Sequence, residues 1–142
     1  MIKLFYQSVI ICGLAALLAG CPGIRLNPGA NKVKVTTAPA PKSCNYIGHV
    51  ENRQINGFNN SYSSFDQILH DEITALRNQA QSMNTNLIVV TQHETTFVQR
   101  PGYDRVNAHI MAGNAYRCSA SVLDKIAVQD DAVLAVIHKK SK

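Results

Sequence analysis

The sequence predicts a small α+β domain with the element order β-α-β-β, in which a three-stranded sheet carries one helix packed on one face. Three observations predict it. One amphipathic helical stripe lies in the middle of the chain, segments with the character of strands lie on either side of it, and two cysteines bracket the whole set. The 142 residues suffice for one small domain and terminal segments. We expect a signal peptide at 1–20, a lipidated flexible tether at 21–43, the domain at 44–118 and a C-terminal extension at 119–142. Residues 32–37 of the tether alternate valine with polar residues and are expected to act as a spacer, with an edge strand added to another sheet as the alternative.

The first strand is expected over residues 45–50, followed by a polar loop over 52–64. Ser64 and Gln67 form a capping-box pattern, which predicts the start of the helix. Five apolar residues then recur at spacings of four and three and form one stripe of an amphipathic helix. They are Leu69, Ile73, Leu76, Ala80 and Met83. Asn84 is expected to end the helix, because asparagine tolerates the left-handed conformation.

Two further strands are expected as a hairpin over residues 86–98 and 108–118. A long loop over 99–107 is expected to join them and is a candidate contact surface. The extension at 119–142 contains a hydrophobic run over 132–137 that suits either a short helix or a strand. That extension either covers the open face of the domain or docks on a partner.

The N-terminal segment has the pattern of a secretory signal peptide, with a positive start, an apolar run over 4–18 and small residues before Cys21. Leu18-Ala19-Gly20-Cys21 resembles the bacterial lipobox, in which the cysteine is acylated and the signal is cut just before it. An ordinary signal peptide with a chance cysteine is the alternative. Acyl chains on Cys21 would anchor the mature chain, and Pro22 at the next position favours sorting to the outer membrane.

Two cysteines, Cys44 and Cys118, are left once Cys12 is removed with the signal and Cys21 is acylated. In an oxidising compartment such a pair is expected to form a disulfide. A redox-active or metal-ligating pair is the alternative, but the chain has no CxxC or clustered Cys/His spacing. We therefore predict a structural bridge between Cys44 and Cys118.

A metal site has three weak candidates, His49, His93 and His109, which lie on the three predicted strands and share a face if the register is favourable. No pair of histidines has the HxH or HxxxH spacing of metal ligands, so exposed or half-buried polar histidines are expected, with no metal or other cofactor. His93 and Glu94 are adjacent and therefore point to opposite faces of a strand, which prevents them from acting as a base and its orienting partner.

The sequence predicts no enzyme, since no Gly-x-Ser-x-Gly elbow and no glycine-rich phosphate loop occurs in it. The carboxylates of the domain are expected at a helix cap, on the helix surface and on a strand surface. They are Asp66, Asp71, Glu72 and Glu94. The formal net charge of +5 is modest and much of it lies in the terminal segments, which argues against a nucleic-acid partner.

Four short motifs occur in a fixed order: Cys44-Asn-Tyr-Ile-Gly48-His-Val50, Leu76-Arg77-Asn78-Gln-Ala80, Asn86 before an apolar strand, and Gly113-Asn-Ala115-Tyr116-Arg117-Cys118. This set resembles the YjeI-type small bacterial lipoproteins, a family of unknown function, over about residues 44–118. More distantly it is similar to the outer-membrane lipoprotein sensor of the Rcs envelope-stress pathway, which has a disulfide-bonded domain of like topology. Gly48 is expected to let the helix approach the sheet closely, and Asn78 to hydrogen-bond backbone at the sheet edge.

Together these features predict a lipid-anchored protein on the periplasmic face of the outer membrane, with envelope proteins as its partners. Lipoproteins of this size also occur in the outer-membrane core of type IVB secretion machines, so a structural or scaffolding role in an envelope complex is the first expectation. Two alternatives stay open. One is an envelope-stress sensor, and the other is a metal- or small-ligand-binding module that uses His49, His93 and His109.

Overall fold

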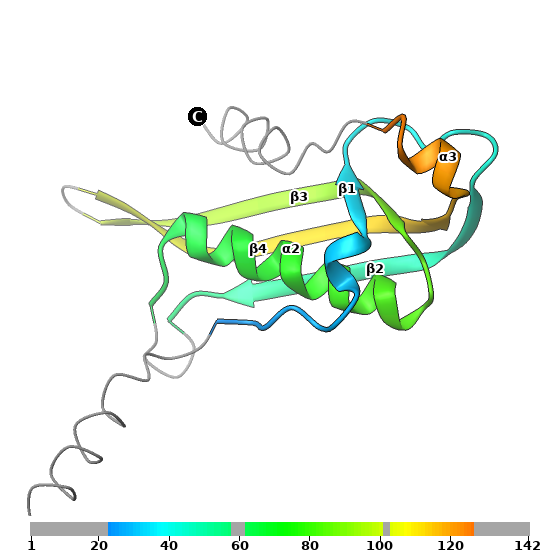
Figure 1. The fold of residues 1–142 in the computed structure, drawn as a ribbon. Coiled ribbons are helices and arrows are strands. Elements are labelled where there is room, and N and C mark those ends of the chain that lie inside the picture. Colours follow the sequence, from blue (N-terminus) through cyan, green and yellow to red (C-terminus); the bar gives the residue numbers. More distant parts are fainter. Residues whose placement is uncertain (1–22, 58–61, 101–102, 127–142) are drawn as a thin grey trace, which may run out of the picture.

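The computed structural model describes residues 23–57, 62–100 and 103–126 and shows one main helix on a four-stranded sheet (Figure 1). The helix is α2 (Phe65–Ser82). The strands are β1 (Lys34–Thr36), β2 (Asn45–Ile55), β3 (Leu87–Arg100) and β4 (Tyr103–Arg117), with the short helices η1 (Ala30–Lys32) and α3 (Ala120–Leu123). The α+β class is confirmed, but the sheet has four strands instead of the three expected.

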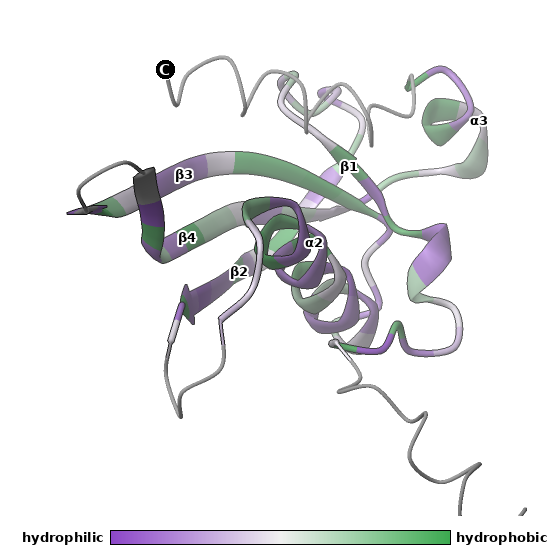
Figure 2. Ribbon diagram, turned by 90° about the vertical axis from the view of Figure 1, so that its left-hand side faces the viewer, coloured by the Kyte–Doolittle hydropathy of each residue, from purple (hydrophilic) through white to green (hydrophobic). Residues whose placement is uncertain are grey.

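The sheet is mixed and has the strand order β1-β3-β4-β2. β3 and β4 form the long central hairpin, antiparallel from the pair Leu87↔Tyr116 to the pair Arg100↔Tyr103. β2 lies antiparallel on the far side of β4, while β1 lies parallel to the first residues of β3. α2 covers one face of this sheet (Figure 2).

β1 comes from the segment that the sequence analysis expected to be a flexible tether. Val33 and Val35 are buried in the main core beneath α2, and Ala30 is buried just before them. The alternation of valine with polar residues therefore forms an edge strand of the chain's own sheet, because that pairing removes both valines from water. The structure thus differs from the expectation of a free spacer over residues 30–36.

The ends of α2 are confirmed as expected. The Ser64 side-chain oxygen accepts a hydrogen bond of 3.2 Å from the backbone N–H of Gln67, which satisfies one of the free donors of the first turn. At the other end, Asn84 has φ 57° and reverses the chain into β3. The predicted apolar stripe is the face that packs on the sheet, with Leu69, Ile73, Leu76 and Ala80 buried and Met83 packed against them.

The disulfide end of the sheet has a second, smaller core on the face opposite α2. Side chains alternate along a strand, so Ile88 joins the main core while its neighbours Leu87 and Val89 face the other way. There they pack with Cys118 and with apolar residues of α3 and the turn after it. The Lys34 Nζ donates to the carbonyls of Leu123 (2.6 Å) and Ile126 (3.0 Å) and so ties this segment to β1.

The loop expected over residues 99–107 is wrong. β3 runs on to Arg100 and β4 begins at Tyr103, with the pair Gln99↔Asp104 inside the range that was expected to be loop. Polar and charged residues in this range pair as strands because the hairpin ladder satisfies their backbone groups. Residues 101–102 lie outside the described part, and residues 99–107 stay a candidate contact surface.

Two glycines of the sheet differ in what an added side chain would meet. A Cβ at Gly113 would lie 2.7 Å from the Val89 carbonyl oxygen and 2.8 Å from Ile88 Cγ2, whereas a Cβ at Gly48 would meet only the end of the Met83 side chain. At Gly48 the close neighbour is thus the side chain of Met83, the residue that follows α2. Backbone cannot move aside as a methionine side chain can.

We expect Gly113→Ala to lower the free energy of unfolding by about 1–3 kcal/mol, in the range of overpacked cores. Gly48→Ala should cost clearly less, because the flexible Met83 can change rotamer. Urea unfolding of the two variants beside the wild type measures the difference. Equal losses in the two variants would show that the β3–β4 contact at Gly113 yields as easily as Met83 does.

Candidate functional site

A chain of three polar side chains joins α2 to the sheet. Glu72 of α2 and His109 of β4 are both 0% exposed, and the His109 Nδ1 is hydrogen-bonded to the Glu72 Oε2. The His109 Nε2 lies 2.6 Å from the Nε2 of His93 on β3. The other carboxyl oxygen of Glu72, Oε1, accepts the backbone N–H of Gln54 at 3.0 Å, so one carboxyl group links the helix to two strands.

The geometry defines what this chain can do chemically. Two imidazole Nε2 atoms in hydrogen-bond contact require one to donate and the other to accept, so the pair shares a single proton between them. Glu72 and His109 are sealed beneath α2, with the ring of Phe65 edge-on to His109 at 5.7 Å, and only the half-buried His93 is open to a solute. A carboxyl group followed by two imidazoles is an order that can pass a proton from one group to the next. Glu72 and His109, however, are buried, and their main role is a hydrogen bond that joins α2 to β4.

These three side chains were not expected to meet. Glu72 was predicted on the helix surface and His109 exposed or half-buried, and both predictions are wrong. A signal was present, since Glu72 is three residues after Leu69 and four before Leu76 and therefore lies on the apolar stripe. His93 and Glu94 do point apart as expected, because successive side chains alternate along a strand. The carboxyl group that orients the histidine pair comes from α2 instead.

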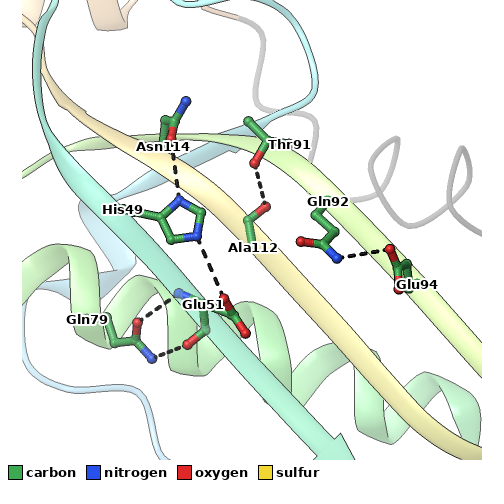
Figure 3. Close-up of polar contacts among 8 residues, drawn as sticks. All are labelled: His49, Glu51, Gln79, Thr91, Gln92, Glu94, Ala112 and Asn114. Atoms are coloured by element: carbon green, nitrogen blue, oxygen red, sulfur yellow. Dashed lines mark hydrogen bonds and ion pairs between the residues drawn. The ribbon is translucent and has the colours of Figure 1, made fainter.

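The structure does not bring the three candidate metal ligands together. His49 lies on the open face of the sheet, where its Nδ1 is 3.4 Å from the Asn114 Oδ1 and its Nε2 is 3.8 Å from the Glu51 Oε2 (Figure 3). His93 and His109 lie on the other face, beneath α2. Within the described ranges, no group of three His, Cys, Asp or Glu side chains is placed to hold a metal ion.

The predicted disulfide is confirmed, with the Cys44 and Cys118 sulfurs 2.05 Å apart. It joins the residue before β2 to the residue after β4, so it closes the edge of the sheet at one end of the domain. Cys21, the predicted lipidation site, lies outside the described residues. In the part of the chain that is described, no helix is long and apolar enough to cross a membrane.

Consecutive side chains of α2 hold the N-terminal segment in place. The Arg77 Nε donates to the carbonyl of Val33 at 3.2 Å. The Asn78 Nδ2 donates to the carbonyl of Arg25, and its Oδ1 accepts the N–H of Asn27, both at 2.8 Å. The segment before β1 is thus fastened along the helix by side chain-to-backbone hydrogen bonds, which sequence reasoning did not foresee.

Gln79, the next residue, holds the outer edge of β2. Its Oε1 accepts the backbone N–H of Glu51 at 3.2 Å and its Nε2 donates to the Glu51 carbonyl at 2.8 Å (Figure 3). The sheet-edge contact was expected from Asn78, so that expectation is wrong by one residue. The backbone N–H and carbonyl of Glu51 are already hydrogen-bonded to Gln79, and this disfavours the pairing of a further strand with β2 at this position.

These features define a disulfide-linked α+β domain whose polar contacts serve mainly to fasten its own elements. Residues 24–118 match the family described as a domain of unknown function (DUF4156), and the chain belongs to that family. The matched range begins at Ile24, where the fastened segment begins, and not at Cys44. The family's domain therefore includes the N-terminal segment.

One solved structure that the chain matches is a protein of unknown function of the DUF74 family from Pediococcus pentosaceus. It is 16% identical, has a TM-score of 0.49, and the match covers 61% of this chain and 98% of that chain. At that TM-score it carries no argument about function. No curated protein matches the sequence. The finer resemblances, to YjeI-type lipoproteins and to the Rcs sensor, stay predictions.

Proposed function

We propose that the protein is an outer-membrane lipoprotein that holds a partner protein in a periplasmic envelope complex, with the disulfide end of its domain as the contact surface. The lipobox pattern ending at Cys21 supports the lipid anchor. The bridge between Cys44 and Cys118 supports an oxidising compartment, because such bridges persist mainly outside the cytosol. We propose no catalytic role, since Glu72 and His109 are sealed within the core.

The observation that supports this contact surface is a pair of exposed apolar residues beside the disulfide. Tyr46 is 58% and Ile47 is 39% exposed, and Ile47 lies at the register shift of β2 between Tyr46 and Gly48. The Tyr46 ring lies edge-on to Tyr116 at 5.7 Å. Tyrosine is enriched in protein interfaces because it brings a large apolar ring and a hydroxyl at low entropic cost. The C-terminal extension begins at the same end of the domain, with α3 (Figure 1).

The double variant Tyr46→Ser/Ile47→Ser is expected to lose most of its envelope partner. Truncating interface residues of this kind commonly costs about 2 kcal/mol or more, a loss of at least about thirtyfold in affinity. The measurement is purification of the tagged, lipidated protein from membranes in mild detergent, followed by size analysis and quantitative mass spectrometry.

Phe97→Ser is the matched control, because Phe97 lies on β3 away from the disulfide end and is 43% exposed. The control should retain the partner at the wild-type ratio. Equal retention in both variants would reject this surface, and a wild-type protein that purifies as a monomer would favour the sensor alternative. The metal-binding alternative lacks support from the positions of His49, His93 and His109, and the type IVB assignment stays a prediction from the sequence.

A further inference from the structure

We infer that the opposite end of the domain, where β2 ends and α2 begins, lies directly on the bilayer that holds the lipid anchor. This inference rests on the proposed function, because it takes Cys21 as the anchoring residue. It replaces the picture of a domain at the end of a long tether, and it gives the domain a defined orientation on the membrane.

The course of the N-terminal segment supplies the direction. The backbone N–H of Ile24 lies 3.3 Å from the Asp71 Oδ1, and the N–H of Asn27 lies 2.8 Å from the Asn78 Oδ1. Those two helix residues are separated by about 10 Å along the axis of α2. Followed back from Asn27 to Ile24, the chain therefore travels towards the first turn of α2. In the sequence, Cys21 precedes Ile24 by three residues.

The length of chain between anchor and domain supplies the height. Only three residue steps separate Cys21 from Ile24, and they span at most about 10 Å when fully extended. A free tether as far as Cys44 would instead reach about 75 Å. As long as the segment from Ile24 stays fastened to Asp71 and Asn78, the domain cannot leave the surface of the bilayer.

The side chains at that end suit a lipid interface. Ile55 is 51% and Tyr62 is 57% exposed, and the Arg105 guanidinium lies 3.6 Å above the centre of the Tyr62 ring. Two hydrogen bonds between Asn56 and the backbone of Ser63 hold this region beside the helix cap. An aromatic ring with a polar tip, a neighbouring cation and an exposed aliphatic side chain are the residue types that settle at the boundary between headgroups and acyl chains.

Tryptophan fluorescence tests this orientation, because the protein contains no tryptophan of its own. Ile55→Trp and Tyr46→Trp place single reporters at the two ends of β2, at positions of similar exposure. Each full-length variant is purified from membranes in lipidated form and reconstituted into phosphatidylethanolamine–phosphatidylglycerol vesicles that contain brominated phospholipid. The Ile55→Trp signal should be blue-shifted and lose intensity to the bromine quencher, while the Tyr46→Trp signal should be unaffected.

Two further variants test the fastened segment. Asn78→Ala removes both hydrogen bonds to the segment and should reduce the quenching of Ile55→Trp. Gln79→Ala removes two hydrogen bonds to β2 from the adjacent position and should leave the quenching unchanged. Equal quenching at positions 55 and 46, or none at either, would overturn the orientation.

Flotation of the vesicles and the intact mass of the protein report the anchor separately. A protein without acyl groups that fails to float would contradict the proposed function and not the orientation. Coupling Cys21 to a maleimide lipid would then restore attachment, and the same comparison of Ile55→Trp with Tyr46→Trp would decide the orientation alone.

Discussion

Removing the disulfide, with Cys44→Ala and Cys118→Ala together, is expected to lower the free energy of unfolding by about 4 kcal/mol. The two cysteines are 74 residues apart, so the bridge excludes many expanded conformations of the unfolded chain. Domains of this size have a total stability on the order of 5–15 kcal/mol, which makes this one bond a large share of it. Guanidinium unfolding of the mature protein and the double variant measures the loss.

The reduced wild type is the control for that experiment, because it has lost the cross-link but keeps both side chains. It should unfold close to the double variant, at a lower denaturant concentration than the oxidised wild type. A double variant as stable as the oxidised protein would mean that the unfolded chain is already held compact by other contacts.

Glu72→Leu is expected to lower the free energy of unfolding by about 3 kcal/mol or more. The substitution leaves the buried His109 Nδ1 and the partly buried backbone N–H of Gln54 without an acceptor. Urea unfolding of the variant measures the loss. His70→Leu, at an exposed position of the same helix, is the control and should stay within about 0.5 kcal/mol of the wild type.

A double-mutant cycle isolates the pair. His109→Leu alone should also be strongly destabilising, because it leaves the Glu72 carboxyl group in the core without its imidazole partner. The double variant Glu72→Leu/His109→Leu should lose less than the two single losses combined, since replacing both partners by apolar groups removes the unsatisfied atoms together. Additive losses would show that Glu72 and His109 contribute independently.

The parts of the fold that depend on neighbouring residues could be predicted from the sequence. Ser64 with Gln67 at the start of α2 and Asn84 after its end act within one turn, so their effect is visible in a short stretch. The pairing of Cys44 with Cys118 could be predicted because the expected acylation of Cys21 and loss of Cys12 leave no other partner.

Pairing between distant segments could not be predicted in the same way. β1 has three residues, and nothing in Lys34–Thr36 indicates that Leu87–Val89 will accept them as a neighbour. The long hairpin was interrupted in the prediction by the turn residues near 101–102, although the ladder continues to Arg100 and Tyr103. The neighbour with which a strand pairs is determined by the whole sheet, and the residue pattern of one strand does not identify that neighbour.

The sequence by itself thus determined the class of fold, the ends of the main helix and the bridge, since these follow from local backbone preferences and from a count of cysteines. Only the tertiary structure decided that the N-terminal segment is part of the domain and that Glu72, His109 and His93 meet. The physical reason is the same in both cases. A buried valine or polar atom takes whichever neighbour the packing of distant elements brings beside it, and that packing depends on all of the elements at once.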